Sequence, residues 1–352
     1  MSTIVEARGL VKTYKRPDGT EVQAVRGIDL DIKKGEVFSL LGPNGAGKTT
    51  TISMISGLLT PTSGDAKIGG FSITKQPMEA KRLLGVVPQE IALYPRLSAR
   101  QNLEFFGKMY GIYGKELAAA VDEVLDFTDL KDRQKDQVDT FSGGMKRRVN
   151  IGVGLLHKPE LVYMDEPTVG VDPQSRRRIL DTVIRLRDER KMTVIYTTHL
   201  MEESQELSNR VGIVDHGQMI AMGTVGELIQ KVGEEDRLVL SVGDQKIDDD
   251  LLAKFQTVSG VTKAEYKAVD IALSPDESGT LKVDKTATGS FKSVSAEAVD
   301  GKVTIYATRG RKALPEALRI ADDAGIEVFS VEVREPDLEA VFLHLTGREL
   351  RD

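Results

Sequence analysis

Two glycine-rich stretches of this sequence have the residue types needed to bind phosphate. The first, GPNGAGKTT, precedes an apolar-faced helical segment. Its glycines let backbone N–H groups turn toward one point, and a helix N-terminus directs positive partial charge to the same place. Lys48 would bridge the β- and γ-phosphates of a nucleotide, and the Thr49 hydroxyl would bind Mg²⁺. The nucleotide contacts predicted in this loop are Gly42, Asn44, Gly45, Gly47, Lys48, Thr49 and Thr50.

The second stretch, FSGGMKRR from Phe141 to Arg148, also resembles a phosphate-binding loop. A serine and a glycine pair precede a basic helical segment there. The groups that would touch phosphate are the Ser142 hydroxyl and the amides of Gly143 and Gly144. One nucleotide needs only one such loop, so the second stretch requires a separate explanation.

Two carboxylates follow a predicted buried strand in LVYMDEP, Asp165 at its end and Glu166 one residue later. Open α/β sheets bind ligands at the carboxyl ends of their strands. At that edge Asp165 could reach Mg²⁺ through water, and Glu166 could take a proton from the water that attacks the γ-phosphate. Adjacent carboxylates after a strand are also common as a helix cap or a solvated turn. The phosphate loop in the same chain favours the catalytic interpretation.

His199 ends the next predicted strand, TVIYTTH. A parallel sheet would bring its imidazole to the same edge, where it could hydrogen-bond the γ-phosphate. A histidine at a strand end is more often structural, and spacing alone leaves both interpretations open.

The remaining pattern predicts elements that could position these residues. Residues 3–41 read as strands with turns, and the helical period begins near residue 97, where Ser98 and Gln101 form a capping box. Two short apolar strands, 161–165 and 193–199, flank a helix at 174–186, and this alternation predicts a parallel sheet. Residues 210–224 predict a hairpin.

Polar sequence near residue 233 marks a boundary, after which the pattern restarts. Strands are expected at 237–242, 262–272, 302–308 and 327–333, with helices at about 248–258, 313–324 and 337–346. We interpret residues 233–352 as a small α+β domain of ferredoxin-like topology, with a polar insertion at about 274–300.

Composition excludes several classes of protein. The chain has 352 residues, a formal net charge of -6 and no cysteine. There is no basic surface pattern for nucleic acid, no disulfide framework and no thiolate metal site. No run of about 18 apolar residues occurs, so we expect no membrane-spanning segment.

Five motifs occur in the order found in the ATP-binding cassette (ABC) family, the ATPase subunits of ABC transporters: GPNGAGKTT, FSGGM, LVYMDEP, VGVD and TTH. The resemblance covers roughly residues 3–230. It implies that Tyr14 stacks on adenine, that Gln89 contacts Mg²⁺ or water and faces the permease, and that Asp172 communicates across a dimer. It assigns His199 to the γ-phosphate.

The same resemblance explains the second phosphate loop. In the family, the segment that matches Ser142, Gly143 and Gly144 caps the ATP bound by another subunit, so two loops imply two chains, either a homodimer or a paired ABC subunit. Here Phe141 and Met145 flank the motif where the commonest family sequence has leucine and glutamine. The groups that would touch phosphate are intact.

The fold class expected from this resemblance is α/β. It comprises a P-loop NTPase (RecA-like) ABC ATPase core at 1–232, with a β-rich N-terminal subdomain and a helical subdomain at about 90–150, followed by the α+β domain. The stretch Glu335–Leu350, with FSGGMKRR and YTTHLMEE, is similar to ATPase subunits of the ABC-2 group, including exporters of the daunorubicin-resistance type. The resemblance implies ATP and Mg²⁺ as ligands, ABC-2 permease subunits as partners, and a peripheral position on the cytoplasmic side of the cell membrane.

Two other functions remain open at this level. A soluble ABC-type ATPase could act as a conformational switch without transport, although such proteins usually fuse two cassettes or carry long coiled coils. The C-terminal domain could also sense a ligand and regulate the ATPase.

Overall fold

The computed structural model describes residues 2–232, 235–267, 274–275, 281–282, 301–334 and 336–347. The chain divides into two compact units. The first unit comprises residues 1–231 and 338–352, and the second comprises residues 232–337.

A six-stranded sheet with the order β10-β9-β3-β8-β7-β6 forms the centre of the first unit. The strands from β9 to β6 are parallel, and the edge strand β10 is antiparallel to β9. Every residue of β3, β7 and β8 is buried, as expected for a parallel sheet covered on both faces. The predicted parallel sheet and hairpin are therefore confirmed. The strands are β3 (Val37–Leu41), β6 (Leu84–Val87), β7 (Leu161–Asp165), β8 (Thr193–Thr198), β9 (Arg210–Asp215) and β10 (Gln218–Gly223).

The N-terminal strands form a second, antiparallel sheet with the order β2-β1-β4-β5. Its inward residues share one hydrophobic core with the central sheet and helix α1, including Leu10, Phe38 and Ile52. The Arg26 amide donates to the Gly217 carbonyl oxygen (2.8 Å), which joins β2 to the turn between β9 and β10. The strands are β1 (Thr3–Lys15), β2 (Glu21–Lys33), β4 (Ser63–Ile68) and β5 (Phe71–Ser72).

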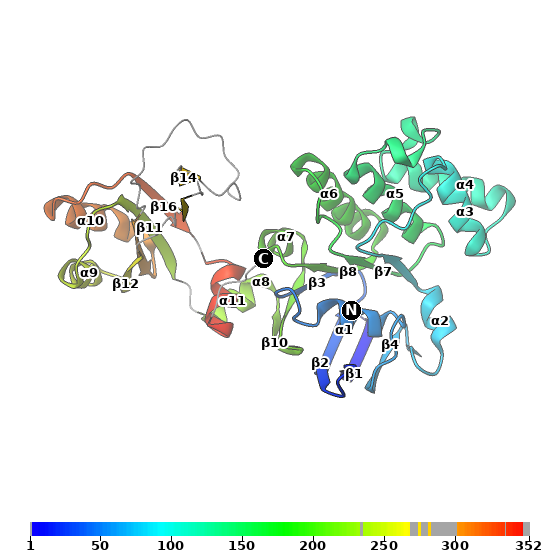
Figure 1. The fold of residues 1–352 in the computed structure, drawn as a ribbon, viewed down its shortest axis with the longest axis horizontal. Coiled ribbons are helices and arrows are strands. Elements are labelled where there is room, and N and C mark those ends of the chain that lie inside the picture. Colours follow the sequence, from blue (N-terminus) through cyan, green and yellow to red (C-terminus); the bar gives the residue numbers. More distant parts are fainter. Residues whose placement is uncertain are drawn as a thin grey trace. The chain divides into compact units, whose positions relative to one another are not determined.

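The helical subdomain lies on one side of β7 and β8, and strands β1, β2 and β4 lie on the other (Figure 1). Its first helix begins as predicted, because Ser98 and Gln101 cap each other's backbone amides. The helices of this subdomain are α3 (Ala99–Met109), α4 (Gly114–Phe127) and α5 (Gly143–Leu155), with 3-10 turns at Lys131–Arg133 and Val138–Thr140. The other helices before residue 233 are α1 (Lys48–Ile55), α2 (Pro77–Arg82), α6 (Pro173–Arg190), α7 (Met201–Leu207) and α8 (Val225–Val232).

The second unit has the β-α-β-β-α-β arrangement of a ferredoxin-like fold. Its strands have the order β12-β15-β11-β16, and all neighbours are antiparallel. Leu238, Leu240 and Val242 alternate along β11 toward a core shared with the helices. The predicted topology is therefore confirmed. The elements are β11 (Asp236–Gly243), α9 (Asp249–Gln256), β12 (Val261–Lys267), β15 (Gly301–Ala307), α10 (Gly310–Asp323) and β16 (Ser330–Arg334).

The polar insertion predicted at about 274–300 falls mostly outside the described residues. Within it, β13 (Ser274–Pro275) pairs with β14 (Leu281–Lys282) in an antiparallel manner. The end of the strand predicted at 262–272 also lies outside the described residues beyond Lys267.

The C-terminal helix α11 (Leu338–Thr346) corrects the predicted domain boundary. We expected it to belong to the α+β domain at 233–352, but it belongs to the first unit and packs against α7. Its apolar stripe accounts for this, because Leu338, Val341 and Phe342 are almost completely buried. Across the described parts of the chain, no helix is both long enough and apolar enough to cross a bilayer.

Replacement of Phe342 by alanine tests this packing. Phe342 is fully buried, so Phe342→Ala should lower the free energy of unfolding by about 3–5 kcal/mol. Met109→Ala is a matched control, because Met109 is 71% exposed at the end of α3. Chemical denaturation of both variants measures the difference. Equal midpoints for the two variants would contradict the packing of α11.

Candidate active site

The loop between β3 and α1 folds around the side chain of Lys48. Its ammonium donates to the carbonyl oxygens of Gly42 (2.7 Å) and Pro43 (3.2 Å). Burial lowers the pKa of Lys48, and the nearby Glu166 carboxylate opposes this shift. Gly47 has φ of 100°, and a Cβ there would lie 2.6 Å from the carbonyl oxygen of Ala24, so only glycine fits.

Strands β7 and β8 bring a carboxylate and hydroxyls to this loop. Asp165 ends β7, and its Oδ1 accepts a hydrogen bond from the Thr197 hydroxyl (2.7 Å). The same oxygen lies 3.5 Å from the Thr49 hydroxyl at the start of α1. Adjacent parallel strands place Asp165 opposite Thr197 in the ladder, so the sheet register fixes this contact.

Glu166 lies at the centre of the remaining predicted residues. Its Oε1 is 3.6 Å from Lys48 Nζ and 3.5 Å from His199 Nδ1, and its Oε2 accepts a long hydrogen bond from Gln89 Nε2 (3.4 Å). Glu166 is 8% exposed, so these polar groups meet away from bulk water. Its backbone has φ of 41°, a left-handed conformation that is strained for a residue with a side chain. The Thr197 hydroxyl oxygen stabilises this conformation by accepting a hydrogen bond from the Glu166 backbone amide (3.0 Å).

The structure therefore brings one group of predicted residues together: Lys48, Thr49, Gln89, Asp165, Glu166 and His199. We call this group the Glu166 cluster. Within the described residues, His199 Nδ1 is buried and has no hydrogen-bond partner. Its contact with Glu166 Oε1, at 3.5 Å, is too long for a good hydrogen bond, so this nitrogen could still hydrogen-bond a ligand.

The second phosphate loop lies outside the hydrogen bonds and ion pairs of the Glu166 cluster. Ser142 caps α5 by accepting from the Met145 amide (3.3 Å). Gly144 packs against α6 so closely that a Cβ would lie 2.2 Å from the Cβ of Ser175. Asp172 caps α6 by accepting from the Ser175 amide (2.9 Å), and this backbone hydrogen bond lowers the pKa of its carboxyl. The starts of α5 and α6 are thus adjacent. Within one chain they form a surface that is separate from the Glu166 cluster.

Tyr14 also lies apart from the Glu166 cluster, near the end of β1. Tyr14 is 42% exposed and lies opposite Val22 of β2, and Lys12 Nζ is 5.4 Å from the centroid of its ring. An exposed aromatic face of this kind can stack on a base.

Sequence reasoning missed Arg147, which links α5 to the Gln89 loop. Its two terminal nitrogens donate to the carbonyl oxygens of Pro88 and Gln89, each at 2.6 Å. Arg147 is 3% exposed, and burial lowers the pKa of its guanidinium. The sequence analysis placed this arginine in a basic helical segment without assigning it a contact, and only the packing reveals its buried role.

The donor set of the Glu166 cluster suits Mg²⁺. Thr49, Asp165 and Gln89 could offer oxygen ligands, which Mg²⁺ prefers, and this ion usually keeps several waters and substrate phosphates. In the parts of the chain that the structure describes, no group of three or more His, Cys, Asp or Glu side chains could hold a metal ion. A divalent ion here would therefore have to share its ligands with nucleotide phosphates.

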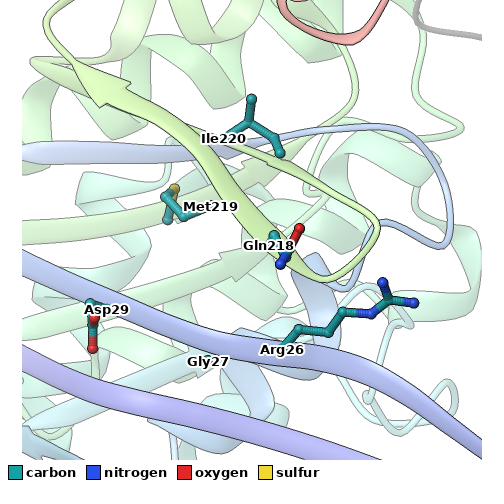
Figure 2. Close-up of a pocket in the computed structure, with 6 residues that line it drawn as sticks. All are labelled: Arg26, Gly27, Asp29, Gln218, Met219 and Ile220. Atoms are coloured by element: carbon teal, nitrogen blue, oxygen red, sulfur yellow. The ribbon is translucent and has the colours of Figure 1, made fainter.

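A groove of about 510 Å³ lies elsewhere on the first unit, between β2 and β10 (Figure 2). It contains none of the predicted site residues. Its lining residues are Arg26, Gly27, Asp29, Gln218, Met219 and Ile220.

Comparisons with known proteins agree with this geometry. A family profile described as ABC transporter matches residues 25–169. The linearmycin resistance ATP-binding protein LnrL of Bacillus subtilis (strain 168) is 44% identical over 99% of this chain and 100% of its own length. The daunorubicin resistance ATP-binding protein DrrA3 of Streptomyces coeruleorubidus is 34% identical over 99% of this chain and 98% of its own length. A dimeric post-hydrolysis structure of the ATP-binding cassette MJ0796, bound to ADP and phosphate, has a TM-score of 0.58 and 26% identity, and it covers 63% of this chain and 98% of its own.

A phosphate loop after β3, with carboxylates after β7 on the same parallel sheet, defines a P-loop ATPase. The chain belongs to the ABC transporter family, and it is an ATP-binding and ATP-hydrolysing member of that family. The family resemblance, the fold class and the enzymatic activity expected from the sequence are confirmed.

The close approach of α5 and α6 gives a test that needs no nucleotide. Gly144→Ala should lower the free energy of unfolding by about 1–3 kcal/mol, because the new methyl group overlaps the Ser175 side chain. Adding Ser175→Gly removes the overlapped atoms, so the double variant should recover part of this loss. Thermal denaturation of the two single variants and the double variant measures the coupling. Strictly additive losses would contradict the contact.

Proposed function

We propose that two copies of this chain, or this chain and a paired ABC subunit, close around two ATP molecules and drive a separate membrane permease of the ABC-2 type. The observation that supports this proposal is that the two glycine-rich stretches, Gly42–Thr50 and Ser142–Gly144, lie at the starts of two different helices, α1 and α5. Ser142, Gly143 and Gly144 begin α5 outside the Glu166 cluster. A second subunit gives them a nucleotide to bind. The dimeric cassettes among the similar structures support this arrangement.

A shared site also gives ATP a means of driving closure. A ligand shifts an equilibrium only through its differential affinity for the two states, and moving 1:99 to 99:1 takes about 5.5 kcal/mol. Contacts from a partner's Ser142 to the phosphates exist only in the closed state, so they supply this difference. A two-fold symmetric pair would form two such sites.

The Glu166 cluster would perform in-line attack of water on the γ-phosphate. Lys48 would exchange the Gly42 and Pro43 carbonyls for phosphate oxygens and attract their negative charge. Glu166 would then be free to accept the proton of the attacking water, and the unpartnered His199 nitrogen would hydrogen-bond the γ-phosphate. Mg²⁺, held near Thr49 and Asp165, would supply additional positive charge. Tyr14 would stack on adenine, and Asp172 would face the partner subunit.

The surface beside Gln89 is the proposed permease contact. Ile91, Tyr94 and Phe105 are all more than a third exposed there, and the Tyr94 and Phe105 rings are 4.7 Å apart. Exposed apolar groups of this kind mark interaction surfaces. Arg147 ties the Gln89 backbone to α5, so movement of the permease contact would reach the second phosphate loop.

The relatives favour transport over a soluble conformational switch. LnrL and DrrA3 are described as resistance ATP-binding proteins, and another relative from Cupriavidus metallidurans is described as a Nod factor export ATP-binding protein. We therefore propose export of a drug, antibiotic or lipid-like compound. The chain would bind its permease peripherally, on the cytoplasmic side of the cell membrane.

Glu166→Gln tests the catalytic assignment. The amide keeps the size of the side chain but cannot accept the proton, so turnover should fall by about 100-fold or more while ATP still binds. The variant should also accumulate as an ATP-dependent dimer in size-exclusion chromatography. Asp188→Asn is a control, because Asp188 is an exposed carboxylate that pairs with Arg187. A Glu166→Gln variant that stays monomeric with saturating ATP, even together with its permease, would contradict the proposal.

Ser142→Arg tests the second phosphate loop. The larger cation should block closure and abolish turnover, whereas ATP binding by the isolated chain should remain within about twofold, because Ser142 lies outside the Glu166 cluster. Fluorescent nucleotide titration and phosphate release measure the two properties. Loss of both would mean that Ser142 serves its own chain's nucleotide.

A further inference from the structure

Helix α7 carries a buried carboxylate, Glu203, although charged side chains are rarely buried in protein interiors. Glu203 is 3% exposed, although its neighbour Glu202 on the same helix is exposed. One oxygen, Oε2, accepts hydrogen bonds from three buried hydroxyls: Thr168 (3.0 Å), Tyr196 (2.8 Å) and Thr198 (3.1 Å). These contacts satisfy one side of the carboxylate completely.

The other oxygen of Glu203 reaches a different element. Oε1 lies 3.6 Å from Nε of Arg176, in the first turn of α6. Among the described residues this oxygen has no hydrogen-bond partner, so the ion pair is its principal compensation. Desolvation by burial and the nearby carboxylate raise the pKa of Tyr196, which keeps its hydroxyl protonated as a donor.

The partners of Glu203 lie beside the residues that act on ATP. Thr198 precedes His199, and its hydroxyl also accepts the Leu200 amide (2.9 Å), so it fixes the turn that carries the imidazole. Thr168 lies in the loop that runs from Glu166 to Asp172 at the start of α6. One carboxylate thus joins the loop after β7, the end of β8 and the first turn of α6.

Stability alone does not explain this arrangement. Burying a carboxylate removes it from water at a large energetic penalty, and well-packed apolar groups often stabilise a protein as well or better. A carboxylate does give directional hydrogen bonds that select one arrangement of the surrounding loops. A buried carboxylate is therefore useful where the relative position of the loops matters more than their stability.

We infer that Glu203 is a positioning residue for ATP hydrolysis, which holds the His199 loop and the Glu166–Asp172 loop in their working arrangement through Thr198 and Thr168. It touches neither ATP nor the attacking water. The inference rests on the roles proposed above for Glu166 and His199.

Glu203→Gln is the direct test, with Glu202→Gln as the matched control on the same helix. The glutamine carbonyl oxygen can still accept hydrogen bonds from the hydroxyls. The side chain loses its charge, and therefore the ion pair with Arg176, and its NH₂ group must face either the hydroxyls or the arginine. We expect kcat of the full-length chain to fall by about 10- to 100-fold while KM for MgATP stays within about twofold. The control should match the unaltered chain in both, and the melting temperatures of all three should be similar.

A second variant separates positioning from general loosening of the fold. Thr168→Val/Thr198→Val removes the two threonine hydroxyls that link Glu203 to the catalytic loops and leaves its contacts with Tyr196 and Arg176 in place, so it should reproduce most of the loss in kcat. Adding Glu203→Gln to it should then reduce kcat by less than about twofold, because the links are already absent. This variant also provides the test if Glu203→Gln does not fold.

Three results would overturn the inference. They are a kcat for Glu203→Gln equal to that of Glu202→Gln, losses that multiply in the combined variant, or a loss of kcat that follows the loss of folded protein. Failure of the proposed function is a different result, namely continued ATP hydrolysis by Glu166→Gln. The two sets of variants therefore distinguish the two failures.

Discussion

The candidate active site is built around an ammonium and a carboxylate held together in a poorly hydrated place. Lys48 and Glu166 are 4% and 8% exposed, and their charged atoms are 3.6 Å apart. Two charges in such a place attract strongly, but each also loses its hydration, so the pair contributes little to stability by itself. In the proposed reaction, the triphosphate would replace Glu166 as the partner of Lys48. Binding of the substrate would then leave Glu166 free to act as the base.

Packing connects helix α5 both to the loop that carries Gln89 and to helix α6. Arg147 binds the backbone of the Gln89 loop from α5, and Gly144 brings the same helix against Ser175 on α6. A shift of α5 must therefore move the backbone at Gln89 or break two charge-assisted hydrogen bonds. The second glycine-rich stretch, at the N-terminus of α5, is in this way linked to the Glu166 cluster through α5 and the backbone of Gln89. Such a connection suits a site completed by another subunit.

Much of this organisation could be predicted because local patterns determine it. Alternating apolar strands and helices gave the parallel sheet, and strand order in a parallel sheet forced Asp165, Glu166 and His199 to one edge. The ferredoxin-like topology followed from six elements of the right type and order. Arg147 and Glu203 could not be predicted, because sequence shows that a helix carries charge but not that packing encloses it. The placement of α11 was missed for the same reason, since its apolar stripe fits any core.

The position of α11 changes how the second unit is understood. The chain leaves the first unit after α8, forms the ferredoxin-like unit, and returns to pack on α7, the helix that carries Glu203. The second unit is therefore inserted into the ATPase unit, not appended to it. Truncation after Lys231 would remove α11 together with the insert and uncover α7, so any loss of activity would have two causes. An internal deletion that keeps α11 isolates the contribution of the second unit, because the helix that supports α7 remains in place.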